Sequence, residues 1–207
     1  MTIIDILKKV NAVITDDHFV YTSGKHGEVY INKDAIYPHP IETSEVGKLF
    51  AEKYQDVDID VVAAPALGGI ILSTWAAYHL SQLKGTEICG VYAEKMPDKS
   101  MAFTRGYDAL IKGKKVLVIE DLTTTGGSVK KVVDLVRETG GEVAAVCVMI
   151  NRNPEAVNTD TIGAPFDALG VLKAEAWDEQ DMPERVKVRP INLNVGHGRK
   201  YLESKRG

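Results

Sequence analysis

Cysteine and long apolar runs are scarce in this sequence. It has only two cysteines in 207 residues, Cys89 and Cys147, and no apolar run approaches the length needed to cross a membrane. Both cysteines lie in apolar, strand-like stretches, which favours small core residues in a reducing compartment over a disulfide or a zinc site. The first ten residues show no signal-peptide pattern. These absences predict a cytoplasmic protein without membrane contact.

An excess of positive charge and a metal-binding pattern are missing as well. The chain has 25 lysines and arginines against 29 aspartates and glutamates, a formal net charge of −4, so no broad basic surface for nucleic acid is expected. The five histidines have no spacing typical of zinc ligands. With 44% apolar and 26% charged residues, the composition fits one α/β domain with a large core.

The stretch from 116 to 129, VLVIEDLTTTGGSV, is the most informative part of the chain. Its apolar start favours a strand buried on both faces, and open α/β sheets bind ligands at the carboxyl ends of such strands. Two carboxylates follow, Glu120 and Asp121, which would repel a bare phosphate but suit sugar hydroxyls or a magnesium ion. The next loop suits a phosphate, because it offers hydroxyls, two glycines that permit close approach of the backbone, and free amides at the start of a helix. Its candidate donor-binding residues are Thr123, Thr124, Thr125, Gly126, Gly127 and Ser128.

A phosphorylated sugar is therefore the expected ligand of this stretch. The loop is not a Walker A loop, since no Gly-Lys-Ser/Thr follows with the required spacing, and it is not a G-x-G-x-x-G fingerprint. The alternative is a buried strand with an acidic edge and an ordinary N-cap turn, which needs neither two carboxylates nor four hydroxyls.

Apolar periodicity predicts an alternating α/β organisation without a linker or a repeat. Strands that alternate with helices favour a parallel sheet with right-handed crossovers. The basic, glycine-containing tail over 184–207 has no pattern that places it. Strands are expected at 60–64, 87–92, 116–120, 142–150 and 166–172, with two more in a hairpin over 19–33, and helices are expected at 3–14, 43–55, 69–83 and 128–139.

A second candidate anion site follows the strand at 60–64, in the turn Ala66-Leu67-Gly68-Gly69. A strand that meets a helix through a glycine-rich turn can bind an anion, although many such turns serve only helix–sheet packing. The place of this turn, one βαβ unit before the acidic stretch, favours binding.

The polar stretch over 94–106, which lacks a regular pattern, is a candidate lid. It carries Lys95, Lys99 and Arg105, whose charges would stabilise a departing anion as the loop closes and excludes water. Three cations on such a loop are equally typical of solvated surface, and the sequence leaves both alternatives open.

Two further positions could bind a base. Arg152 follows the strand at 142–150 and could hold a carboxylate with two parallel bonds, or it could be an exposed arginine that starts a loop. Tyr30, together with Ser23, Gly24 and Lys33, could cover a flat ring, although an aromatic residue in a strand is common.

These stretches resemble those of known enzymes. The acidic pair and its Thr-rich loop resemble the phosphoribosyl-pyrophosphate motif of the type I phosphoribosyltransferases, and most of the chain resembles the orotate phosphoribosyltransferases. The stretch from His18 to Asp34, which contains Thr22-Ser23-Gly24-Lys25-His26 and then Tyr30-Ile31-Asn32, is similar to that family's N-terminal hood. The resemblance implies an α/β fold with a parallel-sheet core, helices on both faces and a small hood. It implies one domain, with the hood over 1–40, the core over 41–183 and the tail over 184–207.

The resemblance also implies roles for individual residues. Ala66, Leu67, Gly68 and Gly69 would hold pyrophosphate, and Thr124, Arg152 and Tyr30 would bind orotate, with Arg152 on its carboxylate. Lys95, Lys99 and Asp121 would be catalytic. Mg²⁺ would be held mainly by the donor near Glu120 and Asp121, and the protein would be a homodimer whose mobile loop serves the neighbouring subunit. The chain departs from the family pattern in three places: Glu94-Lys95 replaces Arg-Lys, the loop has no histidine, and Gly27-Glu28 replaces Ser-Pro.

The expected reaction joins orotate to 5-phosphoribosyl 1-pyrophosphate and gives orotidine 5′-monophosphate and pyrophosphate, a step of pyrimidine nucleotide biosynthesis. The base is itself the nucleophile, so the protein needs no catalytic triad but must position both partners and stabilise the leaving group. Two alternatives stay open: transfer to another base such as a purine, and a nucleotide-sensing relative that has lost turnover.

Overall fold

A computed structural model describes residues 1–21, 23–173 and 175–205, which form two compact units. The first unit contains residues 1–6 and 36–172, and the second contains residues 7–35 and the C-terminal segment from 173. Thr22, part of the stretch that resembles the hood, lies outside the described residues. In the described part of the chain, no helix combines the length and the apolar character that crossing a membrane requires.

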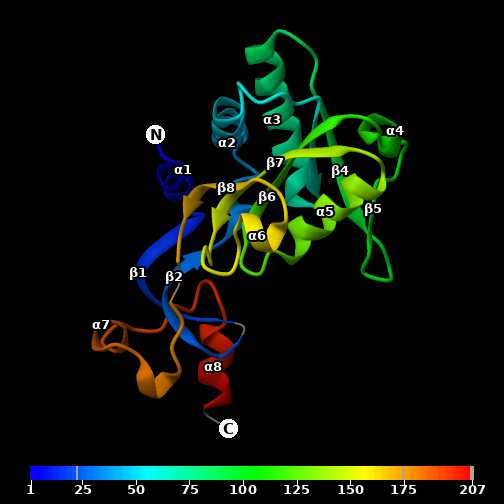
Figure 1. Ribbon diagram of the computed structural model, residues 1–207. Helices are drawn as coiled ribbons and strands as arrows, with labels where there is room; N and C mark the ends of the chain where they lie inside the picture. Colours follow the sequence, from blue (N-terminus) through cyan, green and yellow to red (C-terminus); the bar gives the residue numbers. More distant parts are fainter. Residues whose placement is uncertain (22, 174, 206–207) are drawn as a thin grey trace. The chain divides into compact units, whose positions relative to one another are not determined.

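A mainly parallel sheet forms the centre of the first unit (Figure 1). Its strands lie in the order β5-β4-β3-β6-β7-β8, and only the short β5 runs antiparallel to its neighbour. The apolar run from Val116 to Ile119 in β6 is fully buried, which confirms a strand covered on both faces. The strands are β3 (Val61–Pro65), β4 (Cys89–Lys95), β5 (Met101–Ala102), β6 (Lys115–Thr123), β7 (Glu142–Asn151) and β8 (Phe166–Val171).

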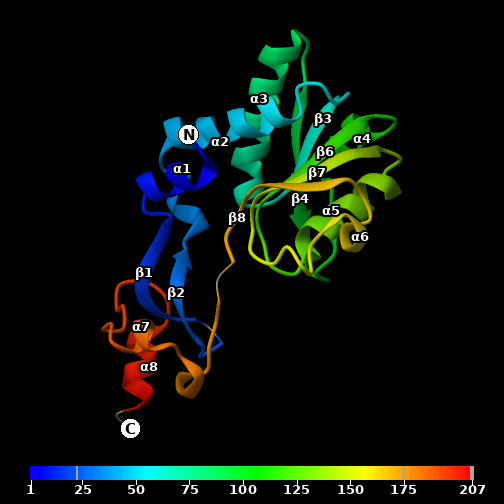
Figure 2. The same ribbon diagram turned by 60° about the vertical axis from the view of Figure 1, so that its left-hand side comes forward.

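Helices cover both faces of this sheet, as the α/β pattern predicts (Figure 2). α3 packs on β3, β4 and β6, and α2 packs on α3, whereas α5 lies on the other face. Residues alternate between the two faces along each strand. Ala63 and Val118 form a core with Val132 and Val136 of α5. The strand residues adjacent to Ala63 and Val118 point to the opposite face, which α3 covers. The helices are α2 (Pro40–Lys53), α3 (Gly68–Lys84), α4 (Tyr107–Ile111), α5 (Gly127–Glu138) and α6 (Thr159–Ile162).

The direction in which strands are added to the sheet reverses between β3 and β6. From β3 the chain passes through α3 on one face to β4, and from β6 it passes through α5 on the other face to β7. The loops after β3 and β6 therefore leave the sheet in opposite directions from neighbouring strand ends. Open α/β sheets bind their ligands at such a switch point.

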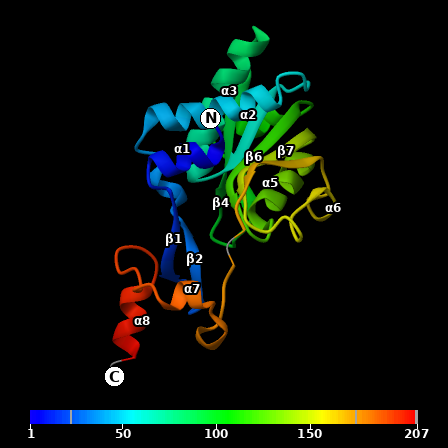
Figure 3. The ribbon, with the colours of Figure 1, turned by 90° about the vertical axis from the view of Figure 1, so that its left-hand side faces the viewer.

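The second unit combines an N-terminal hairpin with the C-terminal segment (Figure 3). β1 (Val13–Val20) and β2 (His26–Ile31) pair antiparallel, which confirms a hairpin, although its first strand begins before the predicted range of 19–33. α7 (Glu184–Lys187) and α8 (Gly198–Ser204) contact β1. His26 and Trp177 exchange backbone hydrogen bonds of 2.8 and 2.9 Å, and the His197 N–H donates to the Val20 carbonyl at 2.8 Å. The tail that the sequence does not place is thus bonded along the hairpin.

The predicted N-terminal helix over 3–14 is wrong beyond its first two turns. α1 (Ile3–Lys9) ends early, and Asn11 adopts a left-handed φ of 55°. Val13 belongs to β1 and pairs with Ile31. The apolar residues after Lys9 fit a helical period, but their β-branched side chains also suit a strand, and the pairing partner decides between the two.

Candidate active site

Three loops that carry predicted site residues lie at one edge of the sheet. They follow β3, β6 and β7, which are parallel neighbours, so their carboxyl ends meet at the same edge. Thr123 pairs with Asn151 across β6 and β7, and the Arg152 N–H donates to the Thr123 carbonyl at 2.9 Å. The structure therefore brings together the Thr-rich loop, the glycine-rich turn and Arg152, which are far apart in the sequence.

The acidic pair is buried and held by hydrogen bonds. Glu120 is 7% exposed and Asp121 is 2% exposed. Asp121 Oδ1 accepts the Leu122 N–H at 2.6 Å, and Asp121 Oδ2 accepts the Tyr37 hydroxyl at 2.8 Å. Glu120 Oε1 accepts the Asp121 N–H at 3.0 Å. These bonds fix the orientation of both carboxylates at the end of β6, as a preorganised binding site requires.

Tyr37 is a site residue that the sequence does not indicate. It lies between the short 3-10 helix η1 (Lys33–Ala35) and α2, far from β6 in the sequence. Besides donating to Asp121, its hydroxyl lies close to the glycine-rich turn, because a Cβ at Gly68 would be 2.1 Å from it. An aromatic residue before a proline gives no signal for such a contact, which depends on the folded structure.

The Thr-rich loop combines one inward hydroxyl with several exposed ones. Thr123 is 5% exposed, and its Oγ1 accepts the Gly126 N–H at 3.0 Å, so this hydroxyl shapes the loop. Gly126 adopts a left-handed φ of 76°, which favours glycine. α5 has no acidic residue in its first turn, so its N-terminal amides and helix dipole favour an anion. The exposed residues of the loop are Thr124, Thr125, Gly127 and Ser128.

The glycine-rich turn after β3 lies directly against the acidic pair. Leu67 is 83% exposed, whereas Gly68 and Gly69 are buried, and the peptide bond between Ala66 and Leu67 is cis. A Cβ at Gly68 would lie 2.3 Å from Asp121 Oδ2, closer than real Cβ atoms approach. Glycine at this position therefore allows the backbone of the turn to pass beside the carboxylate.

Arg152 presents a buried donor at the end of β7. Its side-chain Nε is buried and has no hydrogen-bond partner among the described residues. An unpaired buried donor costs about 1–3 kcal/mol, so this position suits an acceptor supplied by a ligand. The adjacent Asn151 holds the loop in place, since it donates to the Val157 carbonyl at 2.9 Å and accepts the Asn153 N–H at 3.0 Å.

The polar stretch over 94–106 begins as a hairpin, so the expectation that it lacks regular structure is wrong for this part. β5 pairs with the end of β4 and places Lys95 opposite Met101. The sequence does not reveal this hairpin, because β5 has only two residues and Pro97 interrupts the alternation. The lysines expected to act on the leaving group, Lys95 and Lys99, are both exposed, with Lys99 in the turn of the hairpin.

The end of this stretch forms hydrogen bonds with Glu94 in β4. Its carboxylate accepts hydrogen bonds from the Thr104 hydroxyl and from the Arg105 guanidinium, and these two bonds lower the pKa of Glu94. Arg105 adopts a left-handed φ of 61°. Arg105 is thus engaged with Glu94, which leaves the two lysines as the cations of the turn.

Tyr30, the predicted cover for a base, lies in the second unit. Its ring contacts the ring of Phe19, with centroids 5.4 Å apart, as expected for an aromatic residue of a hairpin. Its contact with a base stays a prediction.

Comparison with known proteins identifies the family. The phosphoribosyl transferase domain matches residues 32–168. The orotate phosphoribosyltransferase of Caldanaerobacter subterraneus subsp. tengcongensis is 36% identical over 181 residues, which are 87% of this chain and 89% of that protein.

Solved structures of the family share the fold. The orotate phosphoribosyltransferase of Mycobacterium tuberculosis H37Rv in complex with 5-phospho-α-D-ribosyl 1-diphosphate aligns with a TM-score of 0.62 and 23% identity, over 82% of this chain and 96% of that one. The adenine phosphoribosyltransferase of Thermoanaerobacter pseudethanolicus aligns with a TM-score of 0.62 and 18% identity, over 80% of this chain and 99% of that one. The chain therefore belongs to the phosphoribosyltransferase family and has the type I fold that its sequence predicts.

Proposed function

We propose that this phosphoribosyltransferase acts on orotate. It transfers the phosphoribosyl group of 5-phosphoribosyl 1-pyrophosphate to orotate and gives orotidine 5′-monophosphate and pyrophosphate, a step of pyrimidine nucleotide biosynthesis. The observation that carries this proposal is the buried Nε of Arg152, which has no partner among the described residues and follows the strand next to the Thr-rich loop. Orotate has a carboxylate that matches this donor, and the 36% identical relative is an orotate phosphoribosyltransferase.

The donor is bound by three groups of residues in the first unit. The exposed hydroxyls of Thr125 and Ser128 bind the 5′-phosphate together with the N-terminal amides of α5. Glu120 and Asp121 bind the ribose hydroxyls, while the turn from 66 to 69 holds the pyrophosphate. Thr124, at the start of the exposed part of the loop, contacts orotate.

The reaction is a displacement at the anomeric carbon of the ribose. A ring nitrogen of the orotate anion forms the new bond as the bond to the pyrophosphate oxygen breaks, through an oxocarbenium-like state. The protein supplies no nucleophile, so its contribution is the alignment of the two substrates and the stabilisation of charge on the leaving group. Lys95 and Lys99 supply positive charge for the departing pyrophosphate.

The enzyme requires Mg²⁺ in this proposal. Glu120 and Asp121 provide carboxylate oxygens, the ligand type that Mg²⁺ prefers. Among the described residues no group of three or more His, Cys, Asp or Glu side chains could hold a metal, so Glu120 and Asp121 would hold Mg²⁺ together with the donor. When bound, it offsets negative charge on the pyrophosphate.

We place the enzyme in the cytoplasm. Cys89 and Cys147 are free thiols, as is typical of reducing compartments. Cys147 is fully buried, and burial raises its pKa to about 12. Such a thiol is unreactive and serves core packing.

The enzyme is a homodimer in this proposal, and α3 supplies its interface. Ile71 and Tyr78 are 37% and 52% exposed, and their spacing puts them on one side of this helix. Contiguous exposed apolar side chains mark interaction surfaces. Ile71→Asp is expected to convert the dimer into a monomer in sedimentation experiments, whereas Val171→Asp, at an exposed position on β8, should leave the dimer intact. A parent protein that sediments as a monomer would contradict the assignment.

A panel of bases tests the assignment of orotate. The fold does not select the base, since an adenine phosphoribosyltransferase has a similar one. We expect kcat/KM for orotate to exceed that for uracil, which lacks the carboxylate, by roughly 30-fold to several thousand-fold. Turnover of a purine without turnover of orotate would favour the purine alternative. Donor binding in calorimetry without turnover of any base would favour the nucleotide sensor.

Asp121→Asn is expected to weaken binding of 5-phosphoribosyl 1-pyrophosphate by roughly 10- to 150-fold. A neutral amide loses charge-assisted hydrogen bonds to the ribose hydroxyls, which are worth about 1.5–3 kcal/mol. Calorimetry measures the affinity, and Asp134→Asn, which breaks a surface pair with Lys130 on α5, is the matched control. An affinity equal to that of the parent would remove the acidic pair from the donor site.

Replacing both Lys95 and Lys99 by alanine is expected to lower kcat by about 10²-fold, with a smaller rise in KM for orotate. Loss of one preorganised electrostatic contact to a transition state typically costs about 10²–10³ in kcat. Lys112→Ala, at an exposed lysine after α4, serves as the control. Full activity of the double variant would show that the hairpin lysines are only solvated surface.

A further inference from the structure

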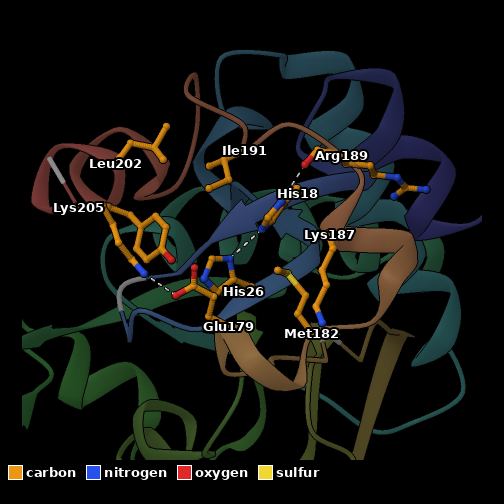
Figure 4. Close-up of a pocket in the computed structure, with 10 residues that line it drawn as sticks. His18, His26, Glu179, Met182, Lys187, Arg189, Ile191, Leu202 and Lys205 are labelled. Atoms are coloured by element: carbon orange, nitrogen blue, oxygen red, sulfur yellow. Dashed lines mark hydrogen bonds and ion pairs between the residues drawn. The ribbon is translucent and has the colours of Figure 1, made fainter.

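A cavity lies entirely within the second unit, between the hairpin and the C-terminal segment (Figure 4). Its volume is about 570 Å³, within the range of small-molecule sites. The hairpin contributes His18 and His26, and the C-terminal segment contributes the apolar side chains of Met182, Ile191 and Leu202. None of these residues takes part in the reaction proposed above.

The two histidines form a directional hydrogen-bond chain. They are 4% and 1% exposed, respectively. His18 Nδ1 lies 3.1 Å from the Arg189 carbonyl, and His18 Nε2 lies 2.8 Å from His26 Nδ1. A carbonyl can only accept, so His18 Nδ1 carries a proton, and when His18 Nε2 carries none it accepts the Nδ1–H of His26. Neutral His26 therefore has its free lone pair on Nε2.

The Tyr201 ring packs against the His26 ring in this cavity, with the ring centroids 5.0 Å apart. His26 Nε2 is buried and has no hydrogen-bond partner among the described residues. Burial lowers the pKa of His26, so the ring is neutral near pH 7 although Glu179 acts in the opposite direction. A buried acceptor of this kind calls for a donor from a bound molecule.

The charges around the cavity favour an anion. Lys205 pairs with Glu179 at 2.6 Å, so these two charges offset each other. Arg189 turns its guanidinium away from the histidines in Figure 4. Lys187 also lines the cavity, and it has no ion-pair partner in the described part of the chain. The lining thus offers the acceptor nitrogen of His26, apolar side chains and the ammonium group of the exposed Lys187. The Tyr201 hydroxyl and Arg189 Nη1 are also buried there without a hydrogen-bond partner among the described residues.

We propose that this cavity binds a small anionic heterocycle. A ring N–H of the ligand donates to His26 Nε2, the flat ring lies against Met182, Ile191 and Leu202, and the acid group pairs with Lys187. Pyrimidine nucleotides have this combination of a ring N–H and a phosphate. The choice of a pyrimidine as probe rests on the proposed function, whereas the site itself does not.

Uridine 5′-monophosphate is a suitable probe, because it has the ring N–H and the phosphate but lacks the carboxylate expected at Arg152. The intact protein, labelled with ¹⁵N-histidine, is titrated with the probe, and the ring nitrogens of His26 are assigned by correlation with its backbone. We expect the His26 Nε2 signal to shift with saturable binding. Lys187→Met should weaken that binding about ten-fold or more, the loss expected for one charge-assisted hydrogen bond. Lys200→Met, at an exposed position on α8 outside the cavity, should bind like the parent.

Three results would overturn the proposal. The first is an Nε2 signal that the probe does not shift, which would mean that the cavity holds only water. The second is equal weakening by Lys187→Met and Lys200→Met. The third is loss of the shift in Asp121→Asn, which would assign the effect to the donor site. Orotate turnover does not enter this readout, so a failure here and a failure of the proposed function are distinguishable.

Discussion

Arg152→Ala is expected to lower kcat/KM for orotate by roughly 30-fold to several thousand-fold, equivalent to about 2–5 kcal/mol. The change removes a guanidinium whose buried Nε has no partner among the described residues, and it leaves the orotate carboxylate without compensation at the end of β7. A planar guanidinium can hold a carboxylate with two parallel bonds, which alanine cannot replace. Affinity for 5-phosphoribosyl 1-pyrophosphate should change little, because the Thr-rich loop follows a different strand.

Steady-state kinetics with orotate and with uracil measure this effect. Arg152→Lys keeps the charge but loses the two parallel N–H donors, so its kcat/KM for orotate should lie between those of the parent and the alanine variant. Arg137→Ala removes an arginine that donates to the Gly163 carbonyl at 2.6 Å on the surface, and it should leave kcat/KM unchanged. An equal loss for both bases would mean that Arg152 only supports the loop after β7.

The strands of the central sheet are predictable because their local sequence and their burial agree. The run from Val116 to Ile119 is apolar on both faces, and both faces are covered in the structure. The strand expected at 60–64 occurs as Val61–Pro65, and the helix expected at 69–83 occurs as Gly68–Lys84. Loops at the ends of these strands follow from the chain direction, so the edge that carries the site could be predicted too.

The second unit is less predictable because its stability depends on contacts between distant parts of the chain. His26 and Trp177 exchange backbone hydrogen bonds across most of the sequence, and no local pattern reports such a pairing. The structure places His18 and His26 on paired strands, although the hairpin predicted over 19–33 does not include His18, and the role of Arg189 depends on the fold of the tail. The end of α1 and the start of β1 cannot be predicted from local sequence for the same reason, because the pairing of Val13 with Ile31 decides between helix and strand.

At the site, residue chemistry is predictable and side-chain direction is not. The Thr-rich loop was recognisable from its hydroxyls and glycines, yet Thr123 turns its hydroxyl inward onto the Gly126 N–H. Tyr37 contacts Asp121 although the two residues are 84 positions apart, and no local pattern indicates this contact. Whether a hydroxyl faces a ligand or its own loop is decided by backbone geometry, which composition does not report.

Gly68→Ala is expected to lower kcat/KM by about 10²-fold or more, with a large loss of affinity for 5-phosphoribosyl 1-pyrophosphate. The added methyl group would lie 2.1 Å from the Tyr37 hydroxyl and 2.3 Å from Asp121 Oδ2, so the turn or the carboxylate must move. Overpacking of this kind costs about 1–3 kcal/mol of unfolding free energy. A misplacement of about 1 Å at a reacting site can cost about 10²-fold in rate. Activity should therefore fall further than thermal stability.

A second substitution separates the two clashes. In the double variant Gly68→Ala/Tyr37→Phe, loss of the hydroxyl removes the shortest contact but leaves the ring carbon Cζ of residue 37 at 2.8 Å and Asp121 Oδ2 at 2.3 Å from the added methyl group, so we expect only partial recovery of donor affinity. Gly127→Ala is the control for stability, since its Cβ would meet only Thr125 Oγ1, at 3.6 Å, and it should unfold at the temperature of the parent. Full recovery in the double variant would locate the strain at Tyr37 alone. A Gly68→Ala protein that melts early but binds the donor normally would show that the turn supports the fold and takes no part in the donor site.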